Sequence, residues 1–241
     1  MPKWASSAVL CLPWLLSGCG GDQSALAPAG RAAHEVALLW WWMLGVSTIV
    51  LIAVCGLWLW AQFRKPVDTD PDTERRIARR WLIGGGLVLP LVTIVVLLAF
   101  GIPIGHRMLP LPLDEAPMKI EVTGHQWWWE VHYPASGITL EDRIVMPAGR
   151  PVDFHLESAD VIHSFWVPRL GGKIDMIPGR TNVLRLQADA PGRFRGQCAE
   201  FCGLRHAHMT LTVDALAEDD WQAWLAERAQ AGQADEAGAS P

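Results

Sequence analysis

Two thiols, an imidazole and a thioether lie within a twelve-residue segment that contains Cys198, Cys202, His206 and Met209. A second imidazole, His163, lies 35 residues before the first thiol, in an apolar run. Thiolate, thioether and imidazole are the ligands that copper prefers, and a single-copper electron-transfer site needs only two His, one Cys and a weak axial Met. Since two thiolates on one short loop can each bridge two metal ions, the extra thiol allows a dinuclear copper centre in which one electron is shared.

The same two thiols permit another interpretation. Of the five cysteines, only Cys198 and Cys202 follow the long apolar stretches of the chain. Two such thiols ordinarily form a disulfide in an oxidising compartment. A membrane-anchored copper chaperone or thiol–disulfide protein, which also combines Cys-x-x-x-Cys with a distant His, is therefore the second hypothesis. It predicts that Met209 is dispensable and that a reversible disulfide forms.

Two uncharged apolar stretches, residues 37–61 and 81–104, precede the metal-binding segment. Each exceeds the ~20 residues with which a helix crosses the hydrocarbon core of a membrane. Neither has the polar stripe of a buried soluble helix, so we expect two transmembrane helices. The intervening loop, residues 62–80, carries six basic side chains close to the ends of the spans, which predicts that it is cytoplasmic. Both ends of the mature chain then lie outside the cytoplasm.

The start of the chain has the features of an export signal. Lys3 is followed by a short apolar run that ends in Leu16-Ser17-Gly18-Cys19, which resembles the bacterial lipoprotein cleavage motif. We therefore expect a signal peptide over residues 1–18, a lipid anchor on Cys19 and a flexible tether over residues 19–36. An ordinary signal with a chance cysteine is the alternative.

Short alternating segments, separated by Gly- and Pro-containing turns, begin at Pro117 and predict an all-β sandwich or barrel over residues 117–215. The predicted strands cover residues 118–122, 127–132, 143–146, 152–156, 162–167, 182–186, 192–197 and 209–213. Residues 216–241 predict a short amphipathic helix and a disordered tail. From residue 107 onward, 12 Lys+Arg stand against 19 Asp+Glu. This acidic balance excludes nucleic acid as a partner and suits a basic protein.

The pattern Cys-x-Glu-x-Cys-x-x-x-His-x-x-Met over residues 198–209, with an upstream His, resembles the dinuclear copper (CuA) loop of cytochrome c oxidase subunit II. Residues 124–129 (GHQWWW), 160–168 (DVIHSFWVP) and 171–180 (GGKIDMIPGR) resemble further segments of that family in the same order. A two-helix hairpin before a cupredoxin-like Greek-key barrel is the layout of the family. The resemblance therefore covers most of the chain.

The resemblance implies that six residues bind the two copper ions: His163, Cys198, Glu200, Cys202, His206 and Met209. The thiolates would bridge the ions, each imidazole would bind one of them, the thioether would bind one, and the glutamate's backbone carbonyl would bind the other. The Glu200 side chain would reach a magnesium ion at the contact with the catalytic subunit. Trp127 would accept electrons from cytochrome c, and Lys173 and Asp175 would lie near the subunit contact.

The implied activity is electron transfer from a c-type cytochrome to the haem of a catalytic haem-copper oxidase subunit, where oxygen is reduced to water. The complex would be a proton-translocating translocase of the bacterial inner membrane, with the β domain in the periplasm. Quinol oxidase subunits of the same fold have lost the copper ligands that this chain retains, and a nitric-oxide-reducing relative carries the same copper domain. Residues 81–90 contain no acid where many members carry a glutamate for proton uptake, so the sequence does not support proton entry through this subunit.

Overall fold

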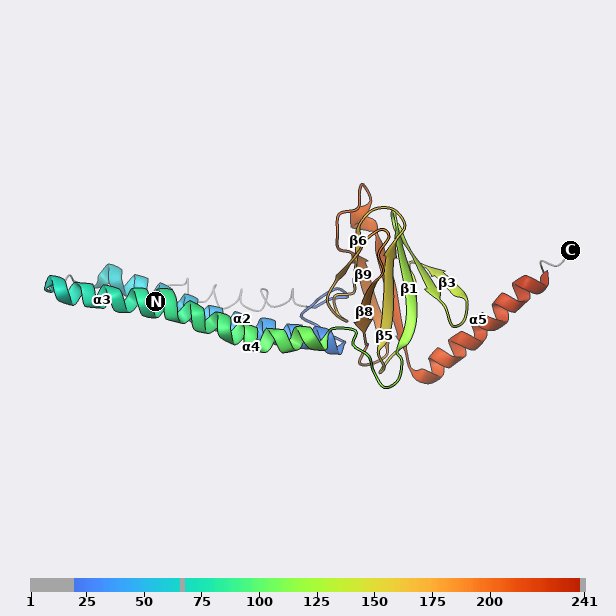
Figure 1. The fold of residues 1–241 in the computed structure, drawn as a ribbon, viewed down its shortest axis with the longest axis horizontal. Coiled ribbons are helices and arrows are strands. Elements are labelled where there is room, and N and C mark those ends of the chain that lie inside the picture. Colours follow the sequence, from blue (N-terminus) through green and yellow to red (C-terminus); the bar gives the residue numbers. More distant parts are fainter. Residues whose placement is uncertain (1–19, 66–67, 239–241) are drawn as a thin grey trace, which may run out of the picture. The chain divides into compact units, whose positions relative to one another are not determined.

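The computed structural model describes residues 20–65 and 68–238, with side chains as far as residue 230. The expected signal peptide and the expected lipid anchor at Cys19 lie outside the described residues. The described chain forms two compact units, which are considered separately: residues up to Ala37 together with Leu109 onward, and Leu38–Met108. Figure 1 shows the elements of both units along the chain.

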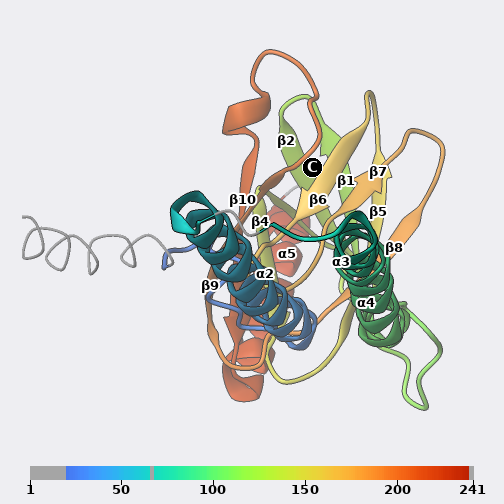
Figure 2. The same cartoon turned by 90° about the vertical axis from the view of Figure 1, so that its left-hand side faces the viewer.

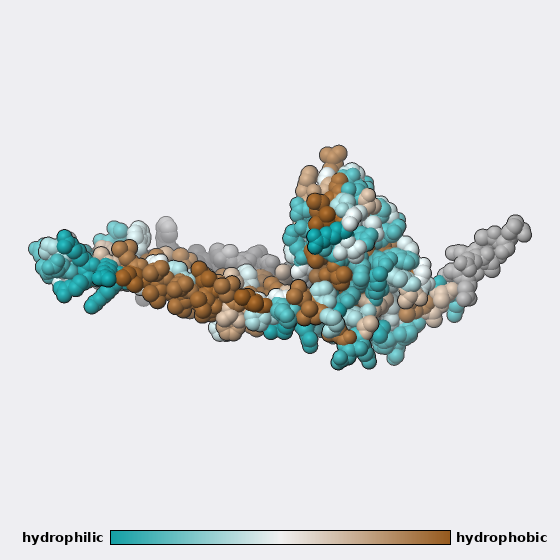
Figure 3. All heavy atoms as spheres, viewed as in Figure 1, coloured by the Kyte–Doolittle hydropathy of each residue, from teal (hydrophilic) through white to brown (hydrophobic). Residues whose placement is uncertain are grey.

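Two helical segments are long and apolar enough to cross a membrane. Helix α2 spans Arg31–Phe63. The second segment is built from α3 (Pro71–Ile83), a π-helical turn η2 (Gly84–Val88) and α4 (Leu89–Arg107). The π turn lies where three glycines precede Pro90, which has no amide hydrogen to donate to the preceding turn. The apolar side chains of these helices are exposed to their surroundings, as a lipid-facing surface requires (Figure 3).

Most of the charged side chains of the second helical segment lie at its start, on α3. The Asp70 side chain caps α3 by accepting from the backbone N–H groups of Asp72 and Thr73. Most arginines of the expected cytoplasmic loop lie on α3, which is an amphipathic helix and not irregular chain.

The segment expected as a tether packs against the β domain. The Ala29 N–H donates to the Arg169 carbonyl at 2.7 Å, and the Ala29 carbonyl accepts from Asp189 N–H at 2.9 Å. At Gly30, a Cβ would lie only 2.4 Å from the Gln187 carbonyl oxygen, so the chain approaches too closely for any side chain there. These backbone contacts fix residues 29–30, and α2 begins directly after them.

Ten strands form two five-stranded sheets, which confirms the predicted all-β domain (Figures 1 and 2). One sheet has the order β3-β2-β1-β5-β8 and the other β4-β10-β9-β6-β7. The strands are β1 (Met118–His125), β2 (Trp128–Tyr133), β3 (Ile138–Glu141), β4 (Arg143–Pro147), β5 (Val152–Ser158), β6 (His163–Trp166), β7 (Ile174–Met176), β8 (Asn182–Leu186), β9 (Gly192–Cys198) and β10 (Thr210–Leu216). The two shortest edge strands, β3 and β7, are not among the predicted strands.

Inward-facing side chains of both sheets form one core. Trp129 of β2 is fully buried and contacts the Phe165 ring of β6 edge-on, with ring centroids 5.9 Å apart. The Tyr133 hydroxyl joins the two sheets because it donates to the Val145 carbonyl and accepts from the Val145 N–H. This core holds β6, β9 and β10 rigidly beneath the segment that joins β9 to β10.

The expected C-terminal helix, α5, spans Glu218–Gly238, and residues near its start pack against the sandwich core. Trp221 is buried, and its ring stacks on Trp224 with centroids 5.1 Å apart. Three acids occupy the first turn of α5, where the helix dipole favours negative charge.

Candidate metal centre

The sheet order brings the two ligand-bearing parts of the chain together. Strands β6 and β9 are antiparallel neighbours, and Phe165 pairs with Cys198. His163 is the first residue of β6 and Cys198 the last of β9, so both lie at the same end of the sheet. Two residues that are 35 positions apart in the sequence therefore come into direct contact.

The segment between β9 and β10 folds back over that end of the sheet. The Cys198 N–H donates to the Met209 carbonyl at 2.9 Å, which closes the base of the loop. The Ala199 N–H donates to the Ser164 carbonyl at 2.9 Å and holds the loop against β6. Gly203 has φ +120°, a backbone conformation that residues with a side chain rarely adopt, and it turns the chain immediately after Cys202.

All six expected ligands converge within this loop and its neighbour strand. The Cys198 and Cys202 sulfur atoms lie 3.8 Å apart, and both thiols are free. Each thiol has its own imidazole. His163 Nδ1 lies 3.8 Å from the Cys198 sulfur, and His206 Nδ1 lies 3.6 Å from the Cys202 sulfur. The Met209 sulfur is 3.8 Å from the Cys202 sulfur.

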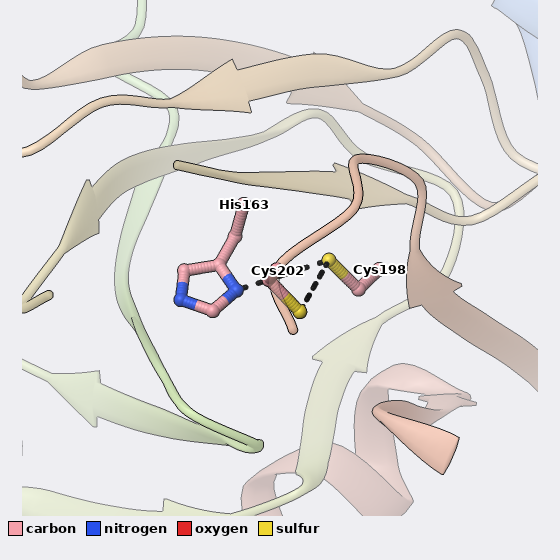
Figure 4. A group of neighbouring side chains, drawn as sticks. All are labelled: His163, Cys198 and Cys202. Atoms are coloured by element: carbon pink, nitrogen blue, oxygen red, sulfur yellow. Dashed lines mark hydrogen bonds between the residues drawn. The ribbon is translucent and has the colours of Figure 1, made fainter. Parts of the chain in front are cut away.

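The sixth expected donor, the Glu200 backbone carbonyl, lies 3.1 Å from the Cys198 sulfur, while the residue itself is exposed. The carbonyl thus faces the cluster, and the exposed position leaves the carboxylate available to a second contact. Figure 4 shows how His163, Cys198 and Cys202 point toward one another.

The composition and burial of the cluster fit copper. His163, Cys198, Cys202 and Met209 are all buried, which excludes water from most of the ligand sphere. Two sulfur anions, a thioether and two imidazoles are soft or borderline donors, which suit copper and disfavour the hard ions calcium and magnesium. Since a thiolate holds a first-row metal at about 2.3 Å, sulfur atoms at the observed separation can contact one ion together.

The protein holds the two thiols in different ionisation states. Burial opposes ionisation of Cys198, but hydrogen bonds from His163 and from the Ser164 backbone lower its pKa to about 6. Burial and the neighbouring Cys198 thiolate raise the pKa of Cys202 to about 12. The pair therefore loses one proton readily and holds the second until a cation replaces it.

A carboxylate orients the first imidazole. Asp160 Oδ1 lies 2.8 Å from His163 Nε2, on the side of the ring opposite the thiol. Because a carboxylate accepts, Nε2 keeps a proton. Nδ1 faces the Cys198 sulfur and would offer its lone pair to a metal ion once that ion takes the place of the Nδ1 proton, which is the arrangement a metal-binding histidine needs. Gly124 of β1 packs directly on the same ring, where a Cβ would lie 2.9 Å from His163 Cδ2. Neither Asp160 nor Gly124 was a candidate on sequence grounds, although Asp160 lies in the same motif as His163.

The remaining expected residues lie around the cluster. Trp127 lies in the turn before β2 rather than on the strand, is half-buried, and donates from Nε1 to the Cys202 carbonyl at 3.3 Å. Two nearby histidines are not among the expected ligands: His125 stacks on Trp128 with ring centroids 4.3 Å apart, and His208 is exposed. Lys173 and Asp175 are exposed near β7.

Comparison with known proteins identifies the family. The model of the cytochrome c oxidase subunit II periplasmic domain matches residues 135–216. The chain is 38% identical over 224 residues to cytochrome c oxidase subunit 2 of Alkalihalophilus pseudofirmus, a match that covers 89% of this chain and 65% of that protein. It is 30% identical over 252 residues to cytochrome c oxidase subunit 2 of Bacillus subtilis, covering 93% of this chain and 68% of that protein. The chain belongs to the cytochrome c oxidase subunit II family.

The subunit II family also contains a relative that is named for a different electron donor. The chain is 31% identical over 224 residues to cytochrome bo(3) ubiquinol oxidase subunit 2 of Pseudomonas putida, covering 88% of this chain and 69% of that protein. Family membership alone therefore does not decide the electron donor. The sulfur and imidazole ligands must distinguish between the possible electron donors. The chain spans about two thirds, 65%, of the length of its Alkalihalophilus relative.

Replacing Gly124 by alanine is expected to weaken copper retention, because the new Cβ would displace the His163 ring from its position beside the thiols. Displacing a metal-orienting contact costs about 10- to 100-fold in affinity, so copper loss to a chelator should be at least ~10-fold faster. The full-length protein in detergent is the sample. Gly172→Ala is the control, since a Cβ there meets nothing within 4 Å. Equal rates in the two variants would contradict the packing role of Gly124.

The metal-free protein should ionise one of its two loop thiols near pH 6, with the thiolate present above that pH and lost below it. Ultraviolet thiolate absorbance across a pH titration measures this step. The step should vanish in Cys198→Ser and persist in Cys202→Ser. A first step only near the ordinary cysteine value, about pH 8.5, would show that His163 does not stabilise the thiolate.

Proposed function

We propose that this chain is the electron-transfer subunit of a membrane-bound haem-copper oxidase. It accepts electrons from a c-type cytochrome at a dinuclear copper centre and passes them to the haem of a catalytic subunit, where oxygen is reduced to water. The observation that carries the proposal is the pairing of each buried thiol with its own imidazole: His163 with Cys198, and His206 with Cys202.

The number of donors favours two ions over one. A single copper site of the electron-transfer type uses four ligands, with one thiolate among them. Six donors gather here. The four that are not thiols divide evenly between the two thiol sulfur atoms. His163 and the Glu200 carbonyl lie beside Cys198, and His206 and Met209 lie beside Cys202. The two thiols between these groups are placed to bridge.

A copper pair held by Cys198, Cys202, His163 and His206 would supply one-electron redox chemistry shared between the two ions. The residues of this chain prepare the site for that chemistry. Burial keeps water from the sulfur atoms, Asp160 holds the His163 proton on Nε2, and the rigid sheet below fixes the separation of the donors. Preorganisation of this kind lowers the cost of each transfer, since the protein does not rearrange.

Trp127 is proposed as the position at which electrons arrive. Its indole N–H contacts the Cys202 carbonyl, so the ring is in direct contact with a ligand-bearing residue. Phe201 and Leu204 of the same loop are 76% and 95% exposed, which gives an apolar surface around the half-buried ring. The acidic balance of the domain would steer a basic donor protein toward it.

The partners follow from the placement of the remaining residues. The two apolar helices anchor the chain in the inner membrane, with the β domain periplasmic and the arginine-rich α3 on the cytoplasmic side. The spans, residues 37–61 and 81–104, contain no histidine, so the oxygen-reducing site belongs to the catalytic subunit. The exposed Glu200 carboxylate would bind magnesium at the contact with that subunit, near Lys173 and Asp175. A signal peptide over residues 1–18 and acylation of Cys19 would add a lipid anchor.

The second candidate, a copper chaperone or thiol–disulfide protein, is favoured by one observation, the lowered pKa of Cys198. Two observations count against it. Both thiols are buried, whereas an exchanging thiol must be accessible to its partner. His206 and Met209 are also placed on the Cys202 thiol, a contact that disulfide exchange does not use.

Full-length protein loaded with copper under reducing conditions and then oxidised tests the proposal. It should hold two copper ions per chain and show an intense purple mixed-valence absorption. Met209→Leu should alter that absorption, because a ligand is lost, whereas Met146→Leu, at a buried methionine of β4, should leave it unchanged. One copper per chain with a blue single-copper spectrum, or no effect of Met209→Leu, would refute the proposal.

A further inference from the structure

The turn between β1 and β2, formed by Gln126 and Trp127, touches both of the segments that bring ligands to the cluster. One segment is the loop after β9, which carries Cys202. The other runs from Asp160 to His163, the first residue of β6. The β6–β9 ladder and the hydrogen bond from Ala199 N–H to the Ser164 carbonyl already join these two segments, and a third contact at their tips would add resistance to their separation.

Gln126 binds the loop through its side chain. Its Nε2 donates to the Cys202 carbonyl at 2.7 Å, and Trp127 Nε1 donates to the same oxygen at 3.3 Å. The turn also packs on Gly203, where a Cβ would lie 3.1 Å from Gln126 Nε2 and 3.3 Å from the Trp127 ring. A residue with a side chain at position 203 would thus strike both members of the turn.

Gln126 binds the other segment through its backbone. Its N–H donates to Asp160 Oδ2 at 2.7 Å. The second oxygen of that carboxylate, Oδ1, accepts from the Val161 N–H at 2.6 Å and lies 2.8 Å from His163 Nε2. The peptide group of Gln126 therefore helps to hold the carboxylate that orients the His163 ring.

We propose that Gln126 is a positioning residue, which braces the Cys202 loop against the Asp160–His163 segment and holds Trp127 on the Cys202 carbonyl. This role deepens the proposed electron-transfer function and rests on it for its purpose, although the brace itself is a property of the metal-free chain. Gln126 binds no copper. It acts by keeping the two halves of the ligand set, and the aromatic ring at which electrons arrive, in one fixed arrangement.

The test replaces the amide while keeping the length of the side chain. Gln126→Met removes the donor and keeps the backbone N–H that Asp160 accepts. Gln126→Glu places an acceptor against the Cys202 carbonyl and should disturb the loop more. Gln187→Met is the matched control, because Gln187 also donates from Nε2 to a backbone carbonyl, that of Gly149, but at a distant turn.

Hydrogen exchange of the metal-free, full-length protein in detergent is the first measurement. The Gln126 variants should exchange faster over residues 199–206, including the His206 N–H that is bonded to the Gly203 carbonyl, while β10 keeps the wild-type rate. A purely structural role would raise exchange throughout the domain. Gln187→Met should leave residues 199–206 unchanged.

Copper release to a chelator is the second measurement, and about a tenfold or greater acceleration is expected for Gln126→Met. Wild-type exchange over residues 199–206 in both Gln126 variants would overturn the brace, as would acceleration spread evenly over the domain. Localised acceleration in a protein that holds only one copper would leave the brace standing and reject the electron-transfer proposal. The two ideas therefore fail separately.

Discussion

The structure depends on the closure of the β9–β10 loop onto strand β6. Two backbone hydrogen bonds make this closure, from Cys198 to Met209 and from Ala199 to Ser164. Each hydrogen bond joins groups that the sandwich core already holds in place, so closing the loop costs little additional conformational entropy. Without the closure Cys202, His206 and Met209 would be solvated groups on a flexible loop, and nothing would hold the Cys202 sulfur 3.8 Å from the Cys198 sulfur without a disulfide between them.

Burial of the two thiols opposes their ionisation, and this opposition makes the site selective for a cation. A buried thiolate is costly unless positive charge or donors compensate it. The protein compensates Cys198 with His163 and backbone N–H groups, and leaves Cys202 with a raised pKa. The metal-free site therefore lacks positive charge, which a bound cation would supply, although its donor atoms are already in place.

The patterns with a clear physical period were predictable from the sequence. The long uncharged runs indicated α2 and α4, and alternation indicated eight of the ten strands. The strands β3 and β7 have four and three residues, too few for alternation to be distinguished from an ordinary loop. Trp127 was assigned to a strand by the same alternation, but the chain turns at Gln126 and Trp127, and β2 begins one residue later.

The ligands were predictable because their chemistry is carried by residue type and close spacing. The residues that orient them were not. Gly124 and Gln126 act through contacts with segments far away in the sequence, and the Asp160 carboxylate, although only three residues from His163, is aimed at the ring by the fold of the segment between β5 and β6. Gly124 is an ordinary strand residue until β1 lies on the His163 ring. Docking of residues 29–30 was hidden for the same reason, since it uses backbone groups that every sequence possesses.

X-ray absorption at the copper edge of the loaded, full-length protein tests the central relation most directly, because it reports the neighbours of each copper. If the two thiols bridge a pair of ions, every copper should show at least two sulfur neighbours and strong scattering from a second copper. Copper with a single sulfur neighbour and no metal–metal scattering would contradict the bridged pair.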